Sequence, residues 1–110
     1  MPSESRLPLF FTPIRASASG NTTVVAADTT KKIKVLSYTF VAGGTVDTIW
    51  RSGSTTILSG TMSWVANTGV STAPGTTYSW IMETAINEAL ILNLSANVAV
   101  GGHLSYYLEE

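Results

Sequence analysis

From Asn21 onward, hydrophobic and polar residues alternate with a period of two, the spacing that places successive side chains on opposite faces of a β-strand. Short stretches rich in Gly, Asn, Ser and Pro interrupt this alternation at intervals of roughly ten residues. The pattern predicts strands at 22–27, 32–42, 45–52, 55–58, 61–66, 77–83, 90–94 and 98–108. About eight short strands at this spacing indicate an all-β protein, built as an antiparallel β-sandwich or barrel.

The first twenty residues do not continue the pattern. They contain Pro8 and Pro13 and then a run of small residues ending at Gly20. Proline disfavours helical backbone in the residue before it, so this segment is expected to be extended. We therefore predict an N-terminal arm over residues 1–20 and a β-sandwich domain over residues 21–110. Removing the first 19 residues should then leave the melting temperature nearly unchanged.

Two register arguments concern the strands on either side of tight breaks. A three-residue loop at 95–97 would pair Leu94 with Val98 and Leu92 with Val100, which puts the apolar side chains on one face. In that register His103 lies on the opposite side, outside the core.

A second hairpin, with a two-residue loop at Gly43-Gly44, would carry bulky apolar groups on both faces. In a small sandwich, one face of each sheet is normally exposed to solvent. A β-bulge near Val35 and Leu36 that switches the faces would explain this pattern locally. A subunit packed on the second face would explain it equally well.

The charged fraction is unusual for a soluble domain. Asp, Glu, Lys and Arg make up only 12% of the chain, about half of the ordinary share, and Ser and Thr fill roughly a quarter of the positions. Such a surface is suited to being covered by copies of the same protein or by a partner. A monomeric Ser/Thr-rich β-domain is the alternative. The run 31–34, KKIK, is interpreted as the solvated start of a strand.

Charge and composition exclude several classes of partner. A net charge of −1 provides no basic field to attract phosphates, so nucleic acid is not expected as a partner. No apolar run reaches the roughly 18 residues of a membrane span, so no membrane association is expected. Cysteine is absent, which rules out disulfides and thiolate metal sites.

The residues offer little for catalysis. With one histidine, no cysteine and seven scattered carboxylates, the chain has no motif of a nucleophilic or metal-dependent enzyme. We expect no enzyme, no catalytic residue, no cofactor and no metal site within one chain. His103 is interpreted as a surface imidazole, and only in a symmetric trimer would three copies meet and bind a metal ion.

The three tryptophans are the candidates for ligand recognition. Trp50, Trp64 and Trp80 are expected mainly in the core or in a subunit interface. Trp64 precedes the longest polar loop, residues 66–75, and is the candidate for an exposed ring that stacks on a sugar. The alternative function is therefore a carbohydrate-binding or receptor-binding β-sandwich module, with a glycan as the ligand.

Three segments carry a resemblance to a known family. They are the strand VLSY at 35–38, the Gly-Ser-Thr turn at 53–55, and the run LNLSANVAVGGHLSY at 92–106. They resemble small proteins encoded in tailed-phage structural gene clusters, which are similar in size and pattern to the jelly-roll decoration (cement) proteins of phage capsids. The resemblance spans roughly residues 21–107 and leaves the arm outside.

The resemblance implies a jelly-roll sandwich and a homotrimer that binds the major capsid protein. It implies a location in the virion, on the capsid surface, and a role in holding neighbouring capsid subunits together. No catalytic residue or cofactor comes with this family. The apolar residues expected at the partner interface are Leu9, Phe10, Phe11, Tyr38 and Phe40.

Overall fold

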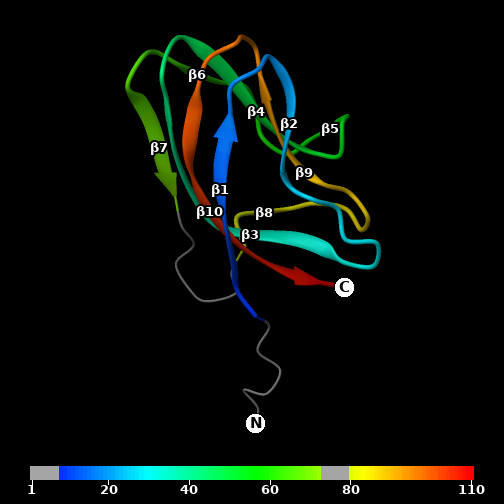
Figure 1. Ribbon diagram of the computed structural model, residues 1–110. Coiled ribbons are helices and arrows are strands. Elements are labelled where there is room, and N and C mark those ends of the chain that lie inside the picture. Colours follow the sequence, from blue (N-terminus) through cyan, green and yellow to red (C-terminus); the bar gives the residue numbers. More distant parts are fainter. Residues whose placement is uncertain (1–7, 73–79) are drawn as a thin grey trace.

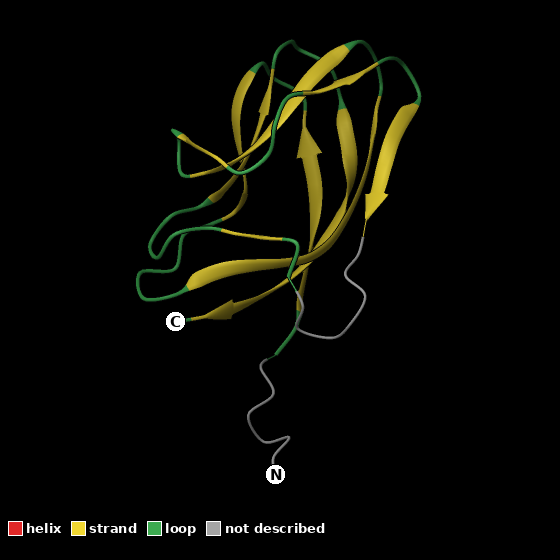
Figure 2. Cartoon of the chain, turned by 180° about the vertical axis from the view of Figure 1, so that it is seen from behind, coloured by secondary structure: helices red, strands yellow, loops and turns green. Residues whose placement is uncertain are grey.

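The computed structural model describes residues 8–72 and 80–110, which form ten β-strands and no helix (Figures 1 and 2). The predicted strand at 77–83 extends partly outside these described residues. The predicted loop at 66–75 does so too, and its described part is wrong as a loop because residues 68–72 form a strand paired with residues 38–42. The strands are β1 Phe10–Ala16, β2 Gly20–Val25, β3 Lys32–Ala42, β4 Val46–Ser52, β5 Thr56–Ile57, β6 Met62–Trp64, β7 Thr68–Thr72, β8 Met82–Glu83, β9 Leu90–Leu94 and β10 Val100–Glu109.

The strands form two antiparallel sheets, as the alternation predicted. The first sheet has the order β1-β10-β3-β7, and β8 pairs with β3 beyond the end of β7. The second sheet has the order β2-β9-β4-β5, and β6 pairs with the opposite end of β4. Buried side chains from both sheets belong to one cluster, so the arrangement is sandwich-like, with the core between the sheets.

Aromatic side chains from both sheets fill the centre of this core. Tyr38 and Phe40 of β3 stack with their ring centroids 5.8 Å apart, and Trp50 of β4 lies 5.1 Å from Tyr38. Phe40 and Trp50 are fully buried. Each such side chain contributes on the order of 1.5–3 kcal/mol through removal of apolar surface from water. These rings join the two sheets at their middle.

Consecutive long strands lie in different sheets, which overturns both predicted hairpins. β3 belongs to the first sheet and β4 to the second, while β9 belongs to the second and β10 to the first. The Gly43 N–H donates to the Ala99 carbonyl at 2.7 Å, so the two connections meet at one end of the sandwich. The apolar sides of successive strands therefore face each other across the core and do not lie side by side in one sheet.

A β-bulge in β3 explains why the core-facing residues change from odd-numbered to even-numbered positions along this strand. Ser37 pairs with Ser105 of β10 and Val35 pairs with Tyr106, which leaves Leu36 without a partner in the register. The extra residue switches the parity: Ile33 and Val35 face the core before it, and Tyr38 and Phe40 face the core after it. Of the two explanations for the apolar pattern of this strand, a bulge near Val35 and Leu36 or a subunit packed on the second face, the structure shows the bulge.

The segment expected to be an arm forms part of the first sheet. β1 is an edge strand that pairs with β10 over its whole length, and Ile14 and Ala16 are 1% and 5% exposed in the core. Pro13 is tolerated because an edge strand has no hydrogen-bond partner on its outer side. Among the described residues, 8–20 therefore belong to the sandwich and not to a separate arm; residues 1–7 lie outside the described residues.

Candidate interaction surfaces

Two residues expected at an interface lie in the core instead. Phe40 is fully buried and Tyr38 is 9% exposed, both between the sheets. They were assigned to an interface because a simple hairpin would have turned them outward, but the bulge at Leu36 turns them inward. Tyr38 and Phe40 are therefore core residues, and their assignment as partner contacts is wrong for this fold.

Leu9, Phe10 and Phe11 lie at the start of the first sheet and are exposed to different degrees. Leu9 and Phe10 are 43% and 38% exposed, and the Phe10 ring stacks on Tyr106 with the centroids 5.3 Å apart. Phe11 is 77% exposed and makes a cross-strand pair with Ser105 on the outer side of the sheet. Phe11 is thus the expected interface residue that projects furthest into solvent.

Phe11 belongs to a surface with few charges, which we call the first-sheet face. The register places three rows of side chains on the outer side of this sheet, opposite the core. Arg15 is the one residue among them that carries a permanent charge. The rows consist of Phe11, Ser105 and Ser37; of Pro13, His103, Thr39 and Ser71; and of Arg15, Gly101, Val41 and Gly69.

Four hydroxyl groups of the first-sheet face already have partners across the strands. The hydroxyls of Ser37 and Ser105 are 2.5 Å apart, and those of Thr39 and Ser71 are 2.9 Å apart. A hydroxyl that keeps its hydrogen bond loses little free energy when water is removed from above it. Covering this face therefore costs less than covering a surface of free polar groups, and Val41, which is 50% exposed, adds apolar area.

His103 lies in the middle row of the first-sheet face and is exposed, as predicted. Within residues 8–72 and 80–110, no group of three His, Asp or Glu side chains is placed to hold a metal ion. Binding of a metal by three copies of His103 stays a prediction about an assembly.

The tryptophans lie in three different environments. Trp50 is buried, and Trp64 is half-buried: its indole N–H donates to Thr48 Oγ1 at 2.9 Å, and its ring meets Phe40 edge-to-face. Trp64 is therefore engaged in packing and is not the free ring that its place before a polar loop suggested. Trp80 is 45% exposed, which sequence reasoning did not single out.

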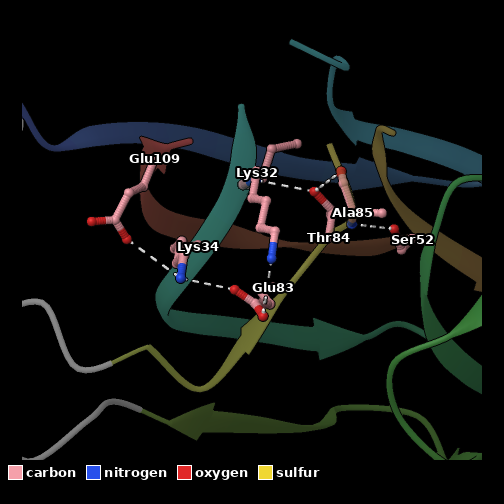
Figure 3. Close-up of polar contacts among 8 residues, drawn as sticks. Lys32, Lys34, Ser52, Glu83, Thr84, Ala85 and Glu109 are labelled. Carbon is pink, nitrogen blue, oxygen red and sulfur yellow. Dashed lines mark hydrogen bonds and ion pairs between the residues drawn. The ribbon is translucent and has the colours of Figure 1, made fainter. Parts of the chain in front are cut away.

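Trp80 lies next to an ion-pair cluster at the other end of the outer side of the first sheet. Figure 3 shows the ion-pairing side chains of this cluster. Lys34 Nζ is 2.9 Å from Glu83 Oε1 and 3.4 Å from Glu109 Oε1, and it lies 3.6 Å from the centroid of the Trp80 ring. Lys32 Nζ approaches Glu83 Oε2 at 3.9 Å. These side chains come from β3, β8 and β10, whose pairing sets their spacing.

The cluster shifts the pKa values of its central pair. Burial alone would lower the pKa of Lys34, but the hydrogen bonds and charges of Glu83 and Glu109 outweigh it and raise that pKa above its ordinary value. The hydrogen bond from Lys34 lowers the pKa of Glu83, against a smaller opposite effect of burial. Only 7% of Lys34 is exposed, so its interpretation as a solvated strand residue is wrong.

Hydrogen bonds anchor the segment that carries Trp80 to both sheets. The Ile81 N–H donates to the Val35 carbonyl at 2.8 Å, and the Ile33 N–H donates to Thr84 Oγ1 at 3.0 Å. The Ala85 N–H donates to Ser52 Oγ of the second sheet at 2.9 Å (Figure 3). The position of Trp80 is thus set by backbone and side-chain contacts beside it.

No protein-family model, curated protein or solved structure matches this chain in sequence or fold comparisons. The described part of the chain contains no helix long and apolar enough to cross a membrane.

Proposed function

We propose that this protein is a structural virion protein, a decoration (cement) protein that assembles as a homotrimer and binds the major capsid protein on the capsid surface. The observation that carries the proposal is the first-sheet face. It has one permanent charge, and four of its hydroxyls are hydrogen-bonded to one another, so it is suited to being covered. Phe11 and Val41 supply its exposed apolar groups. The role is structural, with no catalytic residue.

The strand order supports the fold that this function implies. One sheet reads β1-β10-β3-β7, and the other reads β2-β9-β4 followed by β5 and β6. This order, in which β1 to β4 alternate between the sheets and β9 and β10 return to pair beside β2 and β1, is the one expected for a jelly roll, a fold found in viral capsid and lectin domains. It supports the proposal at the level of architecture only, because one fold serves many functions.

The energetics of such a contact favour a repeated lattice. Apolar area removed from water contributes about 25 cal/mol per Å², and the partners lose translational and rotational freedom on binding. A flat β-face with few charges gives a weak single contact. A trimer that presents three copies to a symmetric capsid binds much more strongly, because the second and third contacts form at high effective concentration.

The first test is the mass of the purified protein by analytical ultracentrifugation. The proposal expects a trimer, and replacement of Phe11 by Ser together with Val41 by Lys should weaken its assembly or its capsid binding without lowering the melting temperature. Ile57→Ser, at a residue 59% exposed on β5 of the second sheet, is the matched control. A wild-type protein that stays monomeric at all concentrations contradicts the homotrimer.

The second test is co-sedimentation with empty capsid shells, followed by imaging of the decorated particles. Wild type and Ile57→Ser should sediment with the shells, and the Phe11→Ser, Val41→Lys double variant should remain in the supernatant. Equal binding by all three proteins would show that the first-sheet face is not the contact.

A further inference from the structure

We propose that Trp80 and the ion-pair cluster beneath it form a binding site for a neutral saccharide. This inference goes beyond the decoration role, which requires no glycan, and it rests on other residues of the same side of the first sheet, beyond the three rows of the first-sheet face. The residues of the Trp80 site are Trp80, Lys32, Lys34, Glu83 and Glu109, from the outer side of the first sheet where β8 and the end of β10 meet β3. In Figure 1 this end lies near the C-terminus, opposite the end of β1 that carries Arg15.

The ring of Trp80 is exposed and yet held in place. It is 45% exposed, whereas Trp50 is buried and Trp64 is half-buried with its N–H bonded. Lys34 Nζ lies 3.6 Å from the ring centroid, and the neighbouring Ile81 N–H is bonded to Val35. A ring that is fixed before binding loses little conformational entropy when a ligand stacks on it.

The ammonium group against the ring is itself immobilised. The side chain of Lys34 is 9% exposed and is bound by carboxylates from two different strands, at 2.9 Å to Glu83 and 3.4 Å to Glu109. Its charge is therefore compensated within the protein and its position is fixed. It supports one side of the Trp80 ring and does not compete for the ligand.

The charge balance of the site selects an uncharged ligand. Two ammonium groups, of Lys32 and Lys34, face two carboxylates, of Glu83 and Glu109, so the site has no net charge with which to attract an anion or a cation. The Glu109 side chain is 46% exposed, and the Glu83 side chain is 35% exposed although its Oε1 atom, which faces Lys34, is buried. Glu109 is therefore the carboxylate more open to hydroxyl donors.

A pyranose ring meets both requirements of the Trp80 site. One side of the sugar presents C–H groups that pack on an aromatic ring, and its rim presents hydroxyls that donate hydrogen bonds to carboxylates. A purely apolar partner would leave the two carboxylates to be desolvated without hydrogen bonds, at a cost in free energy. The geometry therefore favours a neutral sugar over an apolar peptide and over a sulfated or sialylated glycan.

The test starts from an array of neutral and anionic glycans probed with wild-type protein and with Trp80→Ala. We expect neutral glycans to be bound by wild type and lost with Trp80→Ala. Titration with neutral β-1,4-glucose, α-1,4-glucose and β-1,4-N-acetylglucosamine hexasaccharides, followed by calorimetry and tryptophan fluorescence, should then give a dissociation constant below about 1 mM for at least one of them. Trp80→Ala should weaken that binding by about tenfold or more, and Glu109→Gln by a smaller factor.

Controls separate this site from the first-sheet face and from misfolding. Phe11→Ala removes another exposed aromatic ring and should leave glycan binding unchanged, while Trp80→Ala should leave the sedimentation mass and shell binding unchanged. Trp80→Phe keeps a ring for Lys34 and should retain part of the affinity. If Trp80→Ala does not fold, Trp80→Phe and protection of wild-type fluorescence from acrylamide by the hexasaccharide decide the question.

Three results overturn the proposal. They are the absence of any Trp80-dependent neutral glycan on the array, glycan binding that survives Trp80→Ala, and binding confined to anionic glycans. Any of these would leave the proposed decoration role untouched, because that role is tested by Phe11 and Val41.

Discussion

Among single residues, Gly69 and Gly102 determine how closely two neighbouring strands approach β3. A Cβ atom added at Gly102 would collide with the Thr39 carbonyl oxygen and lie 2.6 Å from Phe40 Cα. One added at Gly69 would collide with the Phe40 carbonyl oxygen. Both glycines therefore sit where the backbone on either side of β3 leaves no space for a side chain.

Gly102→Ala should destabilise the fold, because relief of this contact requires a shift of backbone atoms. We expect a loss of about 1–3 kcal/mol or more in the free energy of unfolding, measured by urea denaturation. Gly60→Ala is the matched control: a Cβ there meets nothing within 4 Å, and the change should stay within about 0.5 kcal/mol. Equal stabilities of the two variants would contradict the close packing on β3.

Glu83 makes the stability of the protein depend on pH at the acidic end. Its pKa is lowered from 4.5 in the folded protein, chiefly by the hydrogen bond from Lys34, so the unfolded chain binds its proton more tightly. The stabilisation is therefore complete above pH 4.5 and is lost as the pH falls through the lower folded pKa. The raised pKa of Lys34 acts at the other end: its contribution is present below 10.5 and is lost as the pH rises through the folded pKa.

Glu83→Gln should flatten the decrease in unfolding free energy below pH 4.5 and lower the stability at neutral pH, because it leaves the buried Lys34 with one carboxylate fewer. Thermal melts between pH 3 and 8 test this, with Glu110→Gln at an exposed position as the comparison. An acid limb that is the same in wild type and Glu83→Gln would mean that the pair does not contribute.

Among the strands, β1 shows what the alternation of the sequence can predict and what it cannot. One proline before β1 and one within it suggested an arm. An edge strand, however, needs N–H donors only on the side that pairs with its neighbour, and β1 pairs on that side with β10. The alternation predicted most of the strands, and it left a bulge near Leu36 as one of two explanations for the pattern of β3. It could not predict the pairing. An alternation with a period of two shows which residues share a face of the strand, but it does not show which sheet the strand joins.

The candidate site was predictable only in part for the same reason. Phe11 and His103 are exposed as expected, because no bulge near them changes which face of β1 and β10 the odd-numbered residues occupy. Tyr38 and Phe40 were misplaced by the hairpin that was assumed for β3. Trp80 was named among the three candidate tryptophans, but Trp64 was chosen as the exposed one. The environment of Trp80 could not be predicted, because Lys34 and Glu83 are distant in sequence and meet only through the pairing of β3 and β8.

The two sides of β1 should respond differently to substitution. Ile14→Ala, in the core, should cost about 2–4 kcal/mol of unfolding free energy, whereas Phe11→Ser on the outer side of the same strand should cost less than about 0.5 kcal/mol. Chemical denaturation measures both. For the same reason, deletion of the first 19 residues, which removes β1, should lower the melting temperature strongly, and an unchanged melt would restore the arm interpretation.

At the scale of the whole molecule, the low charge of the first-sheet face leads to a prediction about salt. Surface ion pairs are screened with a Debye length near 10 Å at 0.1 M salt, but apolar burial is not. If Arg15 is the one permanent charge in the contact, the association constant measured by sedimentation should change less than about threefold between 50 and 500 mM NaCl. A steep loss of association with salt would indicate that charged groups elsewhere form the interface.

Strand β10 occupies an interior position in its sheet, between β1 and β3, although it follows every other strand along the polypeptide. During synthesis, β1 and β3 therefore have no strand between them to pair with, and their core-facing side chains stay exposed to solvent. Local pairing cannot close this gap, because the missing member comes from far downstream. Productive folding should thus begin late, after β10 has left the ribosome, and nascent chains stalled before this point should be the species most prone to aggregate.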